Sequence, residues 1–193
     1  MLRGDDGVAR EKLSLIIPTH NRPPYLLERL LRYFVEVGLA YPIVVADSSG
    51  EPAADANQAV LTSLGDALDV RYVGYRPDMN PYSKIAASLD MVESKYSAIC
   101  ADDDFLVPRA IEKCVQFLES NPDYAAAHGR LVSMYPLRVS RGVSKLWTYS
   151  CCQHTIDSAD PCLRLRAFVR LRSDFLFRPT KIGFDAEYAT GGE

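Results

Sequence analysis

The chain has 193 residues, of which 48% are hydrophobic, and its formal net charge is −3 at pH 7. This length suits one domain or a domain with a short appendage, and the apolar content excludes a disordered chain. No apolar run reaches the roughly 18 residues that a membrane span needs, and the start lacks a signal-peptide core, so we expect a cytoplasmic protein. We also expect no nucleic-acid partner.

Apolar runs typical of buried strands alternate with helical patterns over the first 130 residues. The first helix has its apolar residues on one stripe, a proline at its entry and Gly38 at its exit. The predicted strands cover residues 13–19, 70–75, 96–101 and 123–130, and residues 41–50 hold a further strand with its turn. The predicted helices cover residues 23–38, 54–65 and 82–94, and a fourth helix starts at Pro108.

The alternation ends near residue 131. Residues 132–152 are consistent with a hairpin, and residues 159–173 with a helix whose N-cap is Asp160 and whose first residue is Pro161. Residues 131–181 hold nine Lys or Arg against three acidic residues, so this segment carries a charge of +6. Such a pattern fits either a solvated helix face or a patch for phosphate or anionic lipid, and therefore peripheral membrane contact.

Alternating strands and helices with continuous apolar strands predict an α/β fold with a mostly parallel sheet covered on both faces. Ligands in such sheets bind beyond the carboxyl ends of the strands. The loops expected there are "THNRPP" (19–24), "ADSSGEP" (46–52) and "ADDDFLVP" (101–108). Because two of these loops carry acids, we expect the functional site there.

Three consecutive aspartates, Asp102, Asp103 and Asp104, follow the fourth predicted strand. Like charges about 4 Å apart repel by about 4 kcal/mol at an effective dielectric near 20, so they need water, a cation or basic partners. One interpretation is a solvated turn before a helix N-terminus. The other is a hard cation, Mg2+ or Mn2+, bound by one or two of the three, since adjacent side chains of extended backbone point to opposite faces.

Motifs in the order "LSLIIPTHNRPPYLLERLL", "PIVVADSSG" and "KIAASLDMVESKYSAICADDDFLVPRAIEKCVQFLESNPDYA" resemble the nucleotide-binding half of the family-two glycosyltransferases. The resemblance implies the GT-A fold, a Rossmann-like, mostly parallel sheet flanked by helices. It also implies a nucleotide-sugar-binding half at 13–130 and an incomplete acceptor-side region at 131–193, and a polar N-terminal tail at 1–12 precedes them.

The resemblance implies roles for individual residues. Asp47 would hydrogen-bond the base, and Lys84 would lie near the nucleoside. Asp102 and Asp103 would be the ribose and metal acids of a DXD-type motif, with Asp104 as a second metal candidate. The residues expected to line the base pocket are Pro18, Thr19, His20, Asn21 and Arg22. The sequence departs from the family at Ala46 and Ala101, where the family often has acids.

The activity implied is inverting transfer of a sugar from a nucleoside-diphosphate sugar, foremost a UDP-sugar, to a hydroxyl of a glycan, a lipid-linked or a small-molecule acceptor. Mn2+ or Mg2+ would neutralise the negative charge that develops on the leaving diphosphate.

The segment "IGFDAEYATGGE" resembles the family's acceptor-side segment and offers Glu193 and Asp185, with Glu187, as catalytic bases. The family's usual base would follow Glu193, so a frayed tail and a catalytically silent nucleotide-sugar-binding domain are the alternatives. A phosphatase or receiver domain would need an acid directly after the first strand, where this chain has "PTHN".

Overall fold

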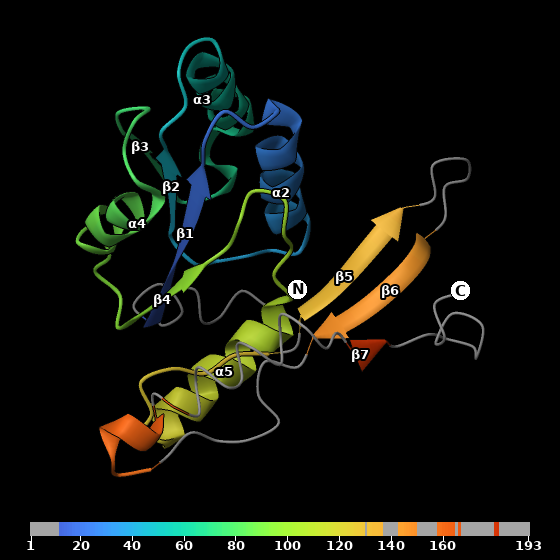
Figure 1. Cartoon of the computed structure of the whole chain (residues 1–193). Helices are drawn as coiled ribbons and strands as arrows, with labels where there is room; N and C mark the ends of the chain where they lie inside the picture. The colour runs from blue at the N-terminus through green and yellow to red at the C-terminus, as the bar shows by residue number, and fades with distance from the viewer. Residues whose placement is uncertain are drawn as a thin grey trace. The chain divides into compact units, whose positions relative to one another are not determined.

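The computed structural model describes residues 12–129, 131–136, 143–149, 158–164, 166 and 180–181 (Figure 1). They belong to two compact units, the first ending at Gln116 and the second beginning at Phe117. The boundary lies inside a helix, and each unit is described below by itself.

The first unit contains a four-stranded sheet with the strand order β3-β2-β1-β4, in which every neighbouring pair is parallel. Its strands are β1 (Leu13–Thr19), β2 (Ile43–Asp47), β3 (Val70–Gly74) and β4 (Tyr96–Ile99). The register aligns Thr19 with Asp47 and Asp47 with Gly74, so the carboxyl ends of β1, β2 and β3 lie level. This arrangement confirms the predicted parallel α/β sheet.

Both faces of the sheet are covered, as the continuous apolar strands predicted. The helices are α2 (Pro24–Glu36), α3 (Ala53–Leu64), α4 (Pro81–Leu89) and α5 (Pro108–Ser120), and a 3-10 turn, η1 (Gly65–Ala67), follows α3. Leu15 and Ile17 of β1 pack on one face against α2, α3 and the first turns of α5, whereas Ile16 packs on the other face with Val44. Figure 1 shows α4 on the side of the sheet opposite to α2 and α3.

Helix α2 follows its sequence pattern closely. It begins at Pro24, and its buried residues are Leu26, Leu27, Leu30, Leu31 and Phe34. This is one helical stripe, so a single face of α2 enters the core. Gly38 follows with φ of +66°, a left-handed conformation that glycine adopts without steric cost.

Two predicted elements were wrong in extent or kind. The helix expected over 82–94 begins at Pro81, where the Asn80 side chain accepts from the backbone of Tyr82 at 2.9 Å, and ends at Leu89. The fifth strand expected over 123–130 is absent from 121–129, where the chain forms turns and irregular structure. Alanines at 125–127 bury little apolar surface, and Tyr124 packs edge-on against Phe117 of α5, with the ring centroids 5.0 Å apart.

The second unit contains an antiparallel sheet with the order β5-β6-β7. Strands β5 (Leu131–Pro136) and β6 (Val143–Tyr149) pair with each other, which confirms the expected hairpin, and β7 (Thr180–Lys181) pairs with β6. Residues 161–164 are helical, and Asp160 Oδ1 accepts from the backbone N–H of Cys162 at 2.8 Å, which confirms the predicted N-cap. Most of the predicted helix beyond this turn lies outside the described residues.

Among the helices that the structure describes, none is both long and apolar enough to cross a bilayer.

Candidate functional site

The loops after β1 and β2 are joined by hydrogen bonds at the carboxyl end of the sheet. His20 Nδ1 lies 2.8 Å from the carbonyl oxygen of Ser48, and the backbone N–H of Asn21 donates to Ser49 Oγ at 2.8 Å. The Asn21 side-chain oxygen in turn accepts from the backbone of Gly50 at 3.0 Å. Asn21 has φ of +49°, a conformation that asparagine tolerates better than most residues. Because both the backbone and the side chain of Asn21 bond the loop after β2, these contacts tie the two loops together shortly before α2 begins.

Asp47, at the end of β2, lies beneath this contact with its carboxylate turned inward. The residue is 1% exposed. Its Oδ1 accepts from the backbone N–H of Ser49 at 2.7 Å, and its Oδ2 accepts from Asn57 Nδ2 at 2.8 Å and from the Tyr72 hydroxyl at 2.9 Å. Burial alone would raise the pKa of Asp47, but hydrogen bonds from Asn57, Ser49 and Tyr72 outweigh burial and lower it. Asp47 therefore joins β2 to α3 and β3 as a buried carboxylate.

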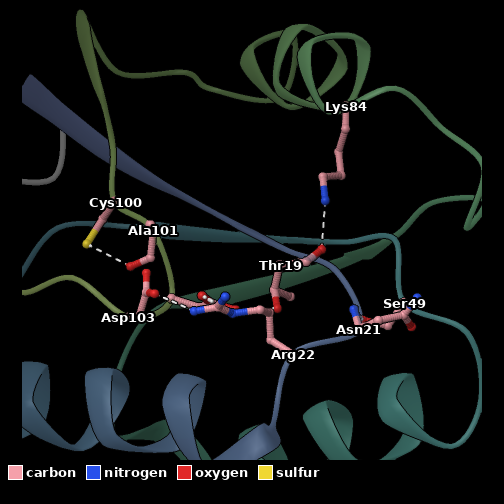
Figure 2. Close-up of polar contacts among 9 residues, drawn as sticks. Thr19, Asn21, Arg22, Ser49, Lys84, Cys100, Ala101 and Asp103 are labelled. Carbon is pink, nitrogen blue, oxygen red and sulfur yellow. Dashed lines mark hydrogen bonds and ion pairs between the residues drawn. The ribbon is translucent and has the colours of Figure 1, made fainter. Parts of the chain in front are cut away.

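Lys84 extends from α4 on the opposite face and ends under the β1 and β2 loops. Its Nζ donates to the Thr19 carbonyl oxygen at 2.7 Å (Figure 2). It also donates to Ser48 Oγ at 2.9 Å. Burial lowers the pKa of this ammonium, and the nearby charges of Asp47 and Asp102 offset part of that shift. Lys84 thus holds two loop segments together from below the site.

The acidic loop after β4 turns instead of continuing as a strand. β4 ends at Ile99, and the backbone N–H of Asp104 donates to the carbonyl oxygen of Ala101 at 3.1 Å. This turn separates the acids. Asp102 is buried and its Oδ2 accepts from Thr19 Oγ1 at 2.7 Å, whereas Asp103 is half-exposed and pairs with the Arg22 guanidinium. The acids therefore lie on a turn and not on extended backbone, and the prediction that one or two of them bind a metal stays a prediction.

Asp104 and Cys100 lie at the base of this turn. Burial raises the pKa of the Asp104 carboxyl, and the charges of Asp103 and Asp102 raise it further. Burial also raises the pKa of the Cys100 thiol, with added contributions from the three aspartates, to about 12. Cys100 is consequently a neutral thiol near pH 7, which does not suit a nucleophile.

Comparison with known proteins identifies the family. Residues 14–157, about three quarters of the chain, match the family Glycosyl transferase family 2. The chain belongs to this family. Among its relatives, the uncharacterized glycosyltransferase YwdF of Bacillus subtilis (strain 168) is 25% identical over 122 residues, which are 63% of this chain and 43% of YwdF. The chain thus spans less than half the length of this curated relative.

A solved structure shares the fold of this family 2 chain. The mannosyltransferase PcManGT from Pyrobaculum calidifontis, solved in complex with GDP-Man and Mn2+, superposes with a TM-score of 0.51 and 20% sequence identity. The match covers 66% of this chain and 36% of PcManGT. It confirms the predicted GT-A architecture.

The predicted site residues of this family 2 chain divide into those that the structure brings together and those that it does not describe. Pro18 lies in β1 directly before the site. The polar contacts join Thr19, His20, Asn21, Arg22, Lys84, Asp102 and Asp103 with the Ser48–Gly50 loop. The base contact predicted for Asp47 stays a prediction, since the structure shows its two oxygens accepting from protein donors. The candidate bases Glu193, Asp185 and Glu187 lie outside the described residues.

Sequence reasoning missed the partners of Asp47. Asn57 shares a helical stripe with Val60, Leu61 and Leu64, so a buried amide on an apolar face was a usable signal for a polar partner. Tyr72, in an apolar strand, carried no comparable signal. Ser48 and Ser49 lie next to Asp47 in a loop that was expected to bind ligand, but nothing in their spacing indicated which contacts they make.

The acidic loop offers oxygen ligands for a divalent cation. No group of three or more His, Cys, Asp or Glu side chains that could hold a metal occurs within the part of the chain that the structure describes. The carboxylates of Asp103 and Asp104 nevertheless match the ligand type that Mn2+ and Mg2+ prefer, and such ions take their remaining ligands from water or substrate phosphate. The residues present therefore fit a cation that is shared with a phosphorylated substrate.

Proposed function

We propose that this chain is the donor-binding part of a glycosyltransferase that moves a sugar from a nucleoside-diphosphate sugar to an acceptor hydroxyl, with inversion and with a divalent cation. The observation that carries the proposal is the hydrogen-bonded convergence of the β1, β2 and β4 loops at the carboxyl end of a parallel sheet, in a chain of glycosyl transferase family 2. That edge is where ligands bind in open α/β sheets.

The described residues supply binding and orientation for such a donor. The segment Thr19–Arg22 and the segment Ser48–Gly50 would border the nucleoside, and Asp47 and Lys84 keep those segments fixed from beneath. Asp103 and Asp104 would hold Mn2+ or Mg2+. The chemistry supplied by such a cation is neutralisation of the charge that develops on the departing diphosphate.

Proton removal from the acceptor needs a base within hydrogen-bond reach of its hydroxyl. Glu193 and Asp185 remain the candidates that the sequence supplies. The acceptor itself is proposed only as a class, a glycan, a lipid-linked sugar or a small molecule with a free hydroxyl.

The identity of the nucleotide is open to direct measurement. The sequence-based expectation is a UDP-sugar, while the fold neighbour PcManGT holds GDP-Man and Mn2+, so both nucleotides belong in the first experiment. Calorimetric titration of UDP, GDP and dTDP, each with and without Mn2+, is expected to give metal-dependent binding of one of them. Absence of binding by all three would overturn the proposal.

A pair of matched variants tests the site. Asp103→Asn is expected to weaken Mn2+-dependent nucleotide binding by at least about tenfold, because a ligating carboxylate loses both its charge and a coordination bond. Glu51→Gln removes one exposed acid from the β2 loop and should change the affinity less than about twofold, since only a screened charge is lost. Equal effects would show that the acidic loop is a solvated turn.

Turnover is a separate measurement. A panel of nucleotide sugars with Mn2+ is expected to show hydrolysis or transfer for the sugar of the nucleotide that binds. Metal-dependent binding without any turnover would favour a catalytically silent nucleotide-sugar-binding domain.

A further inference from the structure

Arg22 forms the only described ion pairs to the acidic loop, and it contacts both acids that are expected to meet the substrate. Its Nη2 donates to Asp103 Oδ2 (Figure 2). Its Nε lies 3.5 Å from Asp102 Oδ1. The guanidinium is always protonated near pH 7. One fixed positive charge therefore lies against the carboxylates where a divalent cation would bind.

The two acids differ in how firmly they are held. Asp102 has a 6% exposed side chain, and its second oxygen, Oδ2, accepts from Thr19 at 2.7 Å. Asp103 has a 45% exposed side chain, and among the described residues its side chain pairs with Arg22, whose own side chain is 44% exposed. Asp103 can thus exchange partners without opening the core, whereas Asp102 is fixed by its buried hydrogen bond.

We propose that Arg22 is an internal counter-ion that competes with the divalent cation for Asp103, so that the cation binds only by displacing the guanidinium. This inference rests on the proposed function, since it assumes that Asp103 is a metal ligand. The backbone at this point is fixed, because Asn21 is hydrogen-bonded to Ser49 and Gly50, so the displacement is a rotation of the Arg22 side chain.

The competition has a consequence for the order of binding. A cation alone must break the pair between Arg22 and Asp103 and then lie near a positive charge. A nucleoside diphosphate provides the displaced guanidinium with another anionic partner, which arginine binds with charge-assisted hydrogen bonds. Cation and nucleotide therefore bind cooperatively, and each raises the affinity of the other by the same factor.

The test measures binding of Mn2+ alone, from the loss of the free Mn2+ electron paramagnetic resonance signal. Arg22→Gln is expected to bind Mn2+ about two- to tenfold more tightly than the wild type, because it removes both the competing ion pair and a like charge. Arg22→Lys keeps the positive charge but loses the planar guanidinium that can pair with a carboxylate through two N–H groups. Its Mn2+ affinity should therefore lie between those of the wild type and Arg22→Gln.

A matched control comes from the same region of the chain. Arg32 pairs with Glu28 one helical turn earlier on α2, at 2.8 Å, and its side chain is 59% exposed. Arg32→Gln removes the same charge from the protein and is expected to change Mn2+ affinity less than about 1.5-fold, since it lies outside the acidic loop. In the double variant Arg22→Gln/Asp103→Asn the gain should disappear, because the competition requires Asp103.

Unchanged or weaker Mn2+ binding by Arg22→Gln would overturn the inference, and so would undetectable Mn2+ binding by both the variant and the wild type. An equal gain in Arg32→Gln would assign the effect to overall charge and overturn it as well. Urea midpoints of all variants show whether they are folded. Nucleotide titrations in the presence of Mn2+ separate the two proposals: metal-dependent nucleotide binding with no effect of Arg22→Gln on Mn2+ alone removes this inference and leaves the proposed function.

Discussion

Replacing Tyr72 by phenylalanine tests the buried carboxylate at the base of the site. Tyr72→Phe deletes one hydroxyl, which donates to Asp47 Oδ2 at 2.9 Å, and leaves the ring in place. Asp47 keeps Asn57 on the same oxygen and the backbone of Ser49 on the other. The variant therefore removes one of several donors without opening a cavity.

The expected loss follows from the kind of hydrogen bond. A bond to a charged group contributes about 1.5–3 kcal/mol, and the donors that remain to Asp47 reduce the cost of losing one. We expect the free energy of unfolding to fall by about 1–2 kcal/mol at pH 7. For a chain of 193 residues, each kcal/mol corresponds to about 2–4 °C in Tm, so the melting temperature should fall by about 2–8 °C.

The loss should depend on pH in a defined direction. Because the folded-state pKa of Asp47 lies below its ordinary value of 3.8, its stabilisation is present above that value and is lost as the pH falls through the lowered pKa. Burial and the neighbouring Asp47 raise the pKa of Tyr72 from 10.0 to about 12, so the wild type also loses stability as the pH rises between these values. The difference in the free energy of unfolding between Tyr72→Phe and the wild type should therefore become smaller at low pH and at high pH.

The assay is urea unfolding followed by circular dichroism at pH 7, near pH 3 and near pH 11. Tyr75→Phe is the matched control, because its hydroxyl contacts the neutral Ser88 Oγ at 3.0 Å. Its loss should be about 0.5–1.5 kcal/mol and equal at pH 7 and near pH 3. A Tyr72→Phe loss that is below about 0.5 kcal/mol, or that does not change toward low pH, would refute the role given to this hydrogen bond.

Three further predictions concern the site, the core and the basic segment. Thr19→Val removes the donor to buried Asp102 and should lower the free energy of unfolding by about 1–3 kcal/mol in urea titration; a loss below about 0.5 kcal/mol would show that Asp102 needs no such donor. Leu31→Ala, at a fully buried position, should cost about 2–5 kcal/mol, against less than about 0.5 kcal/mol for the 40% exposed Val35→Ala, and similar losses would contradict the assigned core face of α2. The +6 segment 131–181 should give salt-sensitive co-sedimentation with anionic but not neutral liposomes, and absence of pelleting at low salt would refute peripheral membrane contact.

Much of the first unit could be predicted from local sequence. The apolar run before Thr19 and the leucine stripe of α2 specify a buried strand and an amphipathic helix within about twenty residues of chain. The carboxyl ends of parallel strands lie at one edge of the sheet, so the sequence also predicts which loops meet there. It does not predict which side chains of those loops contact each other. The strand predicted over 123–130 was wrong because the prediction used local sequence alone. Three alanines are compatible with several local structures, and residues 123–129 are irregular in the folded chain.

The sequence by itself determined which polar residues lie at the ligand side of the sheet, because hydrophobic periodicity and strand ends are local properties. Only the tertiary structure decided which of them meet. Thr19 and Asp102 are 83 residues apart, and they bond because the strand order β3-β2-β1-β4 places β1 between β2 and β4. In the same arrangement the buried Asp47 carboxylate accepts hydrogen bonds from Asn57 and Tyr72, and Asp103 forms an ion pair with Arg22. Partner choice depends on distances between segments that no local pattern encodes, and burial then makes each such choice energetically costly to change.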